Sequence, residues 1–105
     1  MPDYSNVLTA PVTFAASGDN TLVAAVVGKV IKLVRIFVVA SAATNLTFKD
    51  GATALSGALP MAANGALVLD LSDSPWFSTS SVSNNLILNS SAAVQASGTV
   101  YYILV

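Results

Sequence analysis

The stretch that decides the fold is the apolar run at residues 29–41, which reads KVIKLVRIFVVAS. Six of its thirteen residues are Val or Ile, whose branching at Cβ restricts χ1 in a helix and suits a pleated surface. The cations Lys29, Lys32 and Arg35 fall three apart, as they would on a helix. Strict strand alternation is also broken, because Lys32 has the opposite parity to the other two. We therefore predict one long strand that contains a bulge or changes sheet.

The same region, residues 22–43, has the length of a transmembrane helix. Each of its three cations would cost about 2.5–3.5 kcal/mol at the centre of a bilayer. We therefore expect no membrane span and no membrane partner. The first six residues, MPDYSN, lack a basic and an apolar region, so we expect no signal peptide.

Turn-forming residues divide the rest of the chain. They are Gly18-Asp19-Asn20, Asp50-Gly51, Asn64-Gly65 and Gly98. Asp-Gly and Asn-Gly are strong hairpin signals, because type I′ turns need positive φ at both central positions. The strands expected between these turns are residues 12–16, 21–27, 29–41, 45–49, 52–55, 66–71, 86–88 and 99–105.

About eight short strands with regularly spaced turns predict an all-β fold, an antiparallel β-sandwich of the jelly-roll type. An immunoglobulin-like sandwich is the alternative, because periodicity does not reveal strand order. The Ala-rich residues 52–66 could hold one helical turn. We expect residues 1–10 to form an extended N-terminal arm, in which Tyr4, Val7 and Leu8 dock on a neighbouring subunit. Residues 11–105 are expected to form a single β-sandwich domain.

The composition argues against catalysis. The 105 residues include no His, Cys or Glu. This excludes Ser-His-Asp and Cys-His catalysis, ordinary zinc sites, disulfides and thiolate chemistry. Acid–base chemistry would depend on five Asp, four basic residues and three Tyr. We therefore expect no enzyme activity, no cofactor and no small-molecule substrate.

Charge is scarce on this chain. Charged residues make up 9% of it, against roughly 25% in ordinary domains, and the net charge is −1. We expect no nucleic-acid partner, since no basic surface is indicated. A surface of Ser, Thr and Asn with little charge resists association poorly, which predicts lasting contact with other subunits. The alternative is a surface domain that these polar residues merely hydrate.

Two clusters are candidate partner or subunit contacts. Lys29, Lys32 and Arg35 would meet an acidic patch on a partner or, alternatively, protect a sheet edge from mispairing. Trp76 and Phe77 would anchor an interface from a Ser-rich loop. In the alternative interpretation, both rings turn inward and close one end of the sandwich.

The acidic residues give a weak signal for Ca²⁺. Asp70 and Asp73, with Asp19 or Asp50, offer carboxylate oxygens, but Asp in turns usually hydrogen-bonds the local backbone. We therefore expect no metal site. Trp76 with Asp73 would suit a sugar, since sugar sites in β-sandwiches present exposed aromatic rings beside Asp or Asn.

Several segments together resemble a known class of protein. They are residues 28–30, 34–41, 46–51, 58–65, 75–77 and 97–101. This pattern of strands and turns is similar to small β-sandwich virion proteins of tailed bacteriophages, most of all to capsid decoration (cement) proteins, and covers about residues 20–105.

The resemblance implies a jelly-roll-type fold and a homotrimer on the outer capsid surface of the virion. Its partner there would be the major capsid protein, at three-fold positions where shell subunits meet. Related-looking chains also occur in phage tails and fibres, so a tail, fibre or carbohydrate- and host-binding module is the alternative function.

Overall fold

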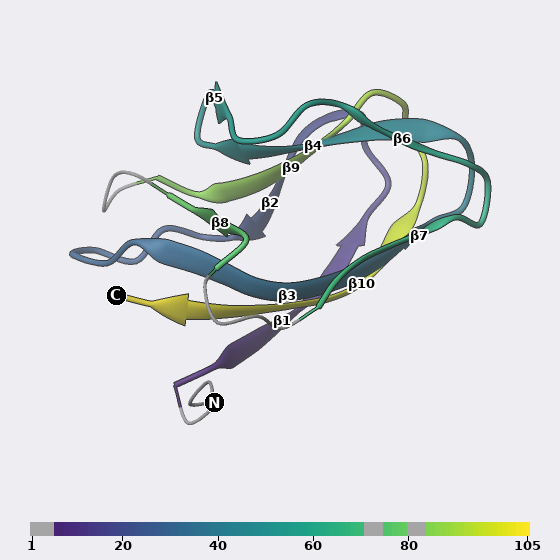
Figure 1. Ribbon diagram of the computed structural model, residues 1–105. Helices are drawn as coiled ribbons and strands as arrows, with labels where there is room; N and C mark the ends of the chain where they lie inside the picture. The colour runs from purple at the N-terminus through teal and green to yellow at the C-terminus, as the bar shows by residue number, and fades with distance from the viewer. Residues whose placement is uncertain (1–5, 71–74, 80–83) are drawn as a thin grey trace.

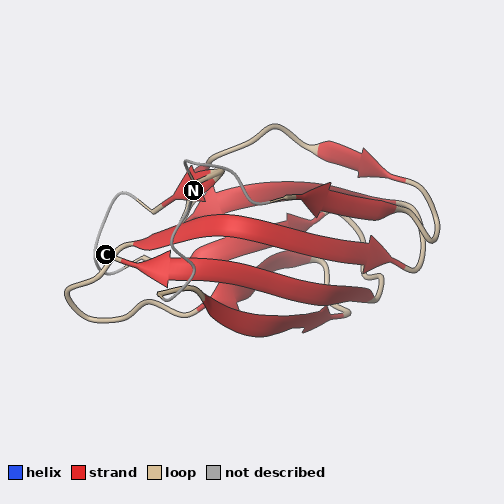
Figure 2. Ribbon diagram, turned by 60° about the horizontal axis from the view of Figure 1, so that its bottom comes forward, coloured by secondary structure: helices blue, strands red, loops and turns tan. Residues whose placement is uncertain are grey.

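The computed structural model describes residues 6–70, 75–79 and 84–105, and this part of the chain contains ten β-strands and no helix. The strands are β1 (Leu8–Phe14), β2 (Gly18–Val23), β3 (Ile31–Ala40), β4 (Thr44–Asp50), β5 (Thr53–Ala54), β6 (Leu59–Met61), β7 (Ala66–Leu69), β8 (Phe77–Ser78), β9 (Leu86–Ser90) and β10 (Ala96–Leu104). They form two antiparallel sheets packed on each other (Figures 1 and 2). The predicted all-β sandwich is confirmed.

The first sheet has the strand order β1-β10-β3-β7, with β8 beside β3. The second sheet has the order β2-β9-β4-β5, with β6 beside β4. Four pairings run outward from the middle of the chain: β4 with β6, β3 with β7, β2 with β9 and β1 with β10. The chain is thus one long two-stranded ribbon, and its successive pairs lie alternately in the two sheets.

A ribbon wrapped in this way is a jelly roll, the architecture predicted from the sequence. Its eight main strands include β6, which was not expected, and exclude β5, which was. β5 and β8, of two residues each, are additions to that plan. The immunoglobulin-like alternative is excluded, because its first two strands are neighbours in one sheet, whereas β1 and β2 lie in different sheets.

β3 contains the predicted bulge. In its pairing with β10, Arg35 lies opposite Tyr101 and Leu33 lies opposite Tyr102, which leaves Val34 as the extra residue. The extra residue brings Lys32 and Arg35 to the same face of the sheet. The bulge therefore accounts for the conflicting parity of Lys32 and Arg35, whereas Lys29 lies outside the strand. No helix in the described residues could span a membrane.

The core lies between the two sheets and is built from their inward-facing side chains. The largest fully buried side chains are Phe48, Ile31, Leu33, Ile36, Leu46, Leu86, Leu88, Val38 and Val100. The rings of Phe77 on β8 and Phe48 on β4 stack with centroids 4.6 Å apart, which links the two sheets. Buried hydroxyls are paired: Thr44 with Ser90 at 2.8 Å, and Thr79, whose Oγ1 accepts from the Ile31 amide at 2.9 Å.

Gly98 lies inside β10, not ahead of it as the sequence indicated. A Cβ atom there would overlap the carbonyl oxygen of Phe37 on β3. Only glycine therefore allows β10 and β3 to approach as they do.

The other turn signals gave mixed results. The Asp50-Gly51 hairpin is confirmed between β4 and β5, with Gly51 at φ 57°. Asn64-Gly65 does form a turn, with the Gly65 amide 2.9 Å from the Ala62 carbonyl oxygen. It connects β6 and β7, which belong to different sheets, so the hairpin predicted there is wrong.

Two further boundaries differ from expectation. Residues 18–20 begin β2 and do not separate two strands, because the Asn20 side chain donates to the Ala16 carbonyl at 3.0 Å and places the corner before Gly18. The strand expected over residues 21–27 ends at Val23, and the helical turn considered for residues 52–66 is absent there. β1 begins at Leu8, so the last residues of the expected arm belong to the first sheet.

Candidate interaction surfaces

The outer face of the first sheet carries a group of exposed apolar side chains. Its outward-facing side chains are those of Thr9, Pro11 and Thr13 on β1, Ser97, Thr99, Tyr101 and Ile103 on β10, Lys32, Arg35, Phe37 and Val39 on β3, and Ala66 and Val68 on β7. We call this set the apolar face. Val68 is 56% exposed and Val39 is 42% exposed.

The strand register makes the apolar face continuous. Phe37 lies opposite Val68 on one side and Thr99 on the other, and Thr99 in turn lies opposite Pro11. An antiparallel sheet that faces water normally alternates apolar residues inward with polar residues outward. The first sheet departs from that rule at its centre, and a face of this kind is typical of a sheet that another surface covers.

Arg35 supplies a positive charge within the apolar face. Its guanidinium carbon lies 5.0 Å from the ring centroid of Tyr101 and 5.8 Å from that of Phe37, which are cation–π distances. Its Nε atom is inaccessible to solvent and lies 3.2 Å from Oδ1 of Asp70. The angle at this contact does not make a hydrogen bond, so the attraction is electrostatic. Asp70 therefore compensates the charge of Arg35.

The outer face of the second sheet is polar. Its outward-facing residues are Asp19 and Thr21 on β2, Ile87 and Asn89 on β9, Asn45, Thr47 and Lys49 on β4, and Pro60 on β6. We call this set the polar face. Ile87 is its one large apolar side chain, and it is buried.

Asp19 is the centre of a polar network on this face. Lys49 Nζ lies 3.0 Å from each carboxylate oxygen of Asp19, and Asn89 Nδ2 donates to Oδ1 at 2.7 Å. The hydrogen bond from Asn89, followed by that from Lys49, holds the pKa of Asp19 below its ordinary value of 3.8.

A third surface is the turn between β2 and β3, at residues 26–29. The Lys29 amide donates to the Val26 carbonyl at 3.0 Å, and Gly28 has φ 77°. Val27, at the tip, is 97% exposed, and Val26 is also exposed. Val30 exchanges two backbone hydrogen bonds with Val105 at the base. The turn is therefore an ordered, convex apolar knob, in a position where polar residues are usual.

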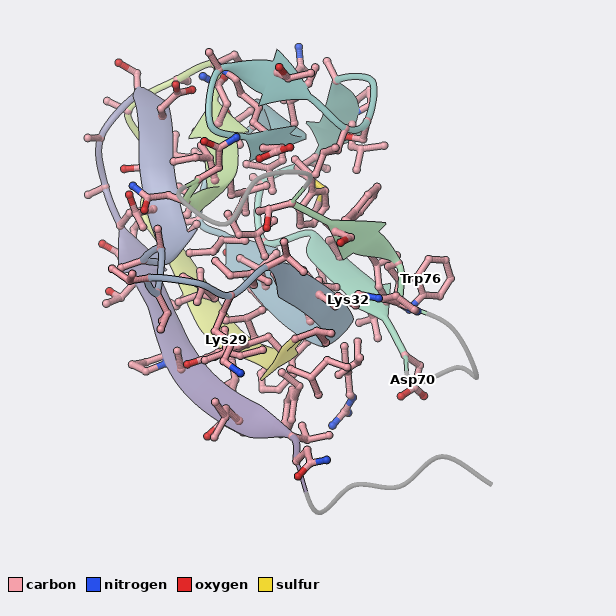
Figure 3. The ribbon with its side chains drawn as sticks, turned by 90° about the vertical axis from the view of Figure 1, so that its left-hand side faces the viewer. Lys29, Lys32, Asp70 and Trp76 are labelled. Carbon is pink, nitrogen blue, oxygen red and sulfur yellow. The ribbon has the colours of Figure 1, made fainter. Side chains whose placement is uncertain are left out.

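The structure separates the three cations of the predicted basic cluster. Lys29 lies in this turn, Lys32 and Arg35 lie on the apolar face, and Figure 3 shows Lys29 apart from Lys32. Neither lysine forms an ion pair with another described residue. The edge-protecting interpretation is wrong for Lys32 and Arg35, because β3 lies between β10 and β7 with β8.

Trp76 and Phe77 point in opposite directions, as neighbours in an extended chain do. Phe77 is half-buried against Phe48, whereas Trp76 is 44% exposed. The Trp76 indole Nε1 donates to the Asp70 carbonyl at 2.6 Å, which fixes the ring at the margin of the sandwich beside Asp70 (Figure 3). The alternative in which both rings close the sandwich holds for Phe77 alone.

The remaining candidates are dispersed. Leu8 is exposed and Val7 half-buried at the start of β1, while Tyr4 and Asp73 lie outside the described residues. Asp50 is buried and accepts from Asn84 Nδ2 at 2.8 Å. Where the chain is described, no three residues of the His, Cys, Asp and Glu types are grouped so as to hold a metal ion.

The sequence analysis missed the apolar face and the exposed valines of the turn. A signal was present in residues 36–40, which are apolar at every position, as in strands covered on both faces. Comparisons of the chain with protein-family models, curated proteins and solved structures found no match.

Proposed function

We propose that this chain is a non-enzymatic structural protein of a phage virion, a capsid decoration or cement protein. It binds the outer surface of the head as a trimer and stabilises the shell by bridging capsid subunits. The observation that carries the proposal is the apolar face, an ordered sheet surface with the composition of a subunit contact. The sequence resemblance to decoration proteins supports the same assignment.

Binding energy alone is sufficient for this role. An interface of about 1,600 Å² is standard for stable protein complexes, and apolar burial contributes about 25 cal/mol per Å². Even after the large cost of association, such contacts oppose the separation of shell subunits. The role needs no nucleophile, metal or cofactor, in agreement with a chain that has no His, Cys or Glu.

The turn at residues 26–29 supplies the contact with the shell in this proposal. Its exposed valines form a knob that fits an apolar depression. Lys29, which has no ion-pair partner among the described residues, suits a carboxylate beside that depression. The partner surface would be the major capsid protein.

The test uses heads assembled without this chain. Purified protein added to such heads should bind to a saturating stoichiometry and raise the temperature at which the heads release DNA. The variant Val27→Ser should bind more weakly while its own unfolding temperature stays the same, because Val27 is almost fully exposed. Heads that neither bind the protein nor gain heat resistance would rule out the cement role.

A second candidate function rests on Trp76. Its ring is held at the surface by the hydrogen bond from Nε1, which leaves an exposed aromatic side chain of the kind that stacks on sugars. In this alternative the chain is a tail- or fibre-associated module that binds host carbohydrate. Glycan-array binding that Trp76→Ala abolishes and Trp76→Phe retains would favour it over the cement role.

A further inference from the structure

We propose that the apolar face is the contact between copies of this chain, so that a second copy covers it in the assembled protein. This inference rests on the self-association in the proposed function and adds the surface responsible for it. Three observations lead to it: the charge balance of the face, its dimensions, and the character of the sheet edges beside it.

Charge balance favours a second copy as the occupant. Arg35 is compensated by Asp70, and Lys32 is the one other charge among the strand residues of the face. Lys32 is thus the single uncompensated charge of the face, so little charge repulsion opposes its contact with another copy of the chain. In a trimer this contact is heterologous, so Lys32 of one copy does not lie opposite Lys32 of the next.

The dimensions of the face are those of a subunit contact. Four strands about 4.8 Å apart, of up to ten residues at about 3.3 Å each, span roughly 19 by 33 Å. This agrees with a molecule whose extents are 34 × 28 × 21 Å. The four strands have 7, 9, 10 and 4 residues, so the projected area is about 480 Å² before side-chain relief is counted, which corresponds to the small end of specific interfaces.

The edges of the first sheet are poor sites for strand addition. β1, at one edge, carries Pro11 in its middle, which has no amide hydrogen to donate to an added strand. β7, on the opposite side, has only four residues. Short edge strands and proline oppose edge-to-edge pairing. Association of this sheet is therefore expected through its face.

The test introduces one carboxylate on each outer face. Val68→Glu alters the apolar face, and Thr21→Glu is the matched control on the polar face. Both residues are exposed, both lie on edge strands, and each stands two residues from an Asp that pairs with a cation. Molar mass is measured by light scattering and by sedimentation over a range of concentrations, and folding is checked by thermal unfolding.

We expect the wild-type chain and Thr21→Glu to associate equally. Val68→Glu should raise the dissociation constant about 30-fold or more, because it buries an unpaired carboxylate in an apolar contact. If Val68→Glu proves unfolded, Val68→Thr, which keeps the shape and adds a hydroxyl, should still weaken association several-fold. A Val68→Glu protein that is folded and associates like wild type would overturn the assignment of this face.

Failure of the inference and failure of the proposed function give different results. If Val68→Glu associates normally and the wild type still stabilises heads, only the face is wrongly assigned. If the wild type is monomeric at every concentration but binds heads, both the inference and the proposed trimer are wrong, and the cement role is still supported. If a wild-type oligomer dissociates with Val68→Glu but does not bind heads, the inference holds and the cement role fails.

Discussion

The two sheets of this jelly roll come from one folded ribbon and share one core, yet their outer faces differ. On the second sheet, Asp19, Asn89 and Lys49 form a hydrogen-bonded network over the strands. On the first sheet, Phe37 on β3 and Val68 on β7 lie side by side on the outer face. Since the inner faces already bury the core, we attribute the difference to the proposed surroundings of each outer face: water over the second sheet, and a second copy of the chain over the first.

Each face also handles its ion pair differently. Lys49 forms a hydrogen-bonded ion pair with Asp19, and the side-chain amide of Asn89 donates to the same carboxylate. Polar groups therefore surround this pair of charges. Arg35 instead lies over the rings of Tyr101 and Phe37, and its contact with Asp70 lacks hydrogen-bond geometry. The guanidinium of Arg35 is thus matched to an apolar setting, in which its flat, weakly hydrated surface packs well.

The largest expected effect on stability concerns the close pairing of β10 with β3, the two central strands of the apolar face. Gly98→Ala places a Cβ on the Phe37 carbonyl and should lower the free energy of unfolding by about 3 kcal/mol or more. The control is Gly57→Ala, where no heavy atom lies within 4 Å and the change should be within about 0.5 kcal/mol. Urea denaturation of the two variants measures the difference, and equal stabilities would contradict the overlap.

The next effect concerns the contact that joins the two sheets. Phe77→Ala removes the ring stacked on Phe48 and should cost about 2–3 kcal/mol of stability. Trp76→Ala, one residue away but exposed, should cost no more than about 1 kcal/mol. Thermal unfolding of both variants checks this order, and the reverse order would show that Trp76 carries the packing.

A smaller effect is expected at Arg35. Arg35→Ala should cost about 1 kcal/mol, because the exposed ion pair contributes little and the cation–π contacts contribute about 0.5–1 kcal/mol. Arg35→Lys keeps the charge but loses the planar stacking, so it should recover less than half of that loss. Asp70→Asn serves as the control for the ion pair. A loss for Asp70→Asn as large as that for Arg35→Ala would show that the contacts of Asp70, and not the stacking of Arg35, account for the stabilisation.

The smallest effect lies on the polar face and depends on pH. The pKa of Asp19 is lowered in the folded protein, so its stabilising contribution is complete above the unfolded-state value near 3.8 and is lost as the pH falls through the folded-state value. At neutral pH, Asp19→Asn should cost no more than about 0.5 kcal/mol, since the pair is solvent-accessible. Unfolding measured from neutral pH to about pH 2 should show the two proteins converging in acid, and a constant gap would contradict the role of the carboxylate.

The fold was predictable because its signals are local. β-Branching identified β3, the conflicting parity of Lys32 and Arg35 indicated the bulge, and Asp50-Gly51 marked the β4–β5 hairpin. It was not predictable that the strands on either side of Asn64-Gly65 belong to different sheets, because a turn signal does not indicate whether the chain continues in the same sheet. Gly98 was misplaced for a similar reason: its role depends on Phe37, which is distant in the sequence.

The candidate surfaces were harder to predict than the fold. Charged and aromatic residues attract attention in a sequence, and they gave Lys29, Arg35 and Trp76 as candidates. The apolar face depends on which parity of each strand points outward and on which strands are neighbours. In the sequence, Val39 and Val68 look like ordinary core residues. Only the strand register, which places Val68 beside Phe37, shows that they belong to one exposed surface.

The position of β10 between β1 and β3 has a consequence for biosynthesis. A ribosome delivers the chain from its amino end, so the middle of the first sheet stays vacant until the last strand emerges. Until then β1 lacks its partner in that sheet, and pairing that spans most of the chain is slow to form. The outer face of the first sheet is therefore complete only once β10 has paired with both of its neighbours.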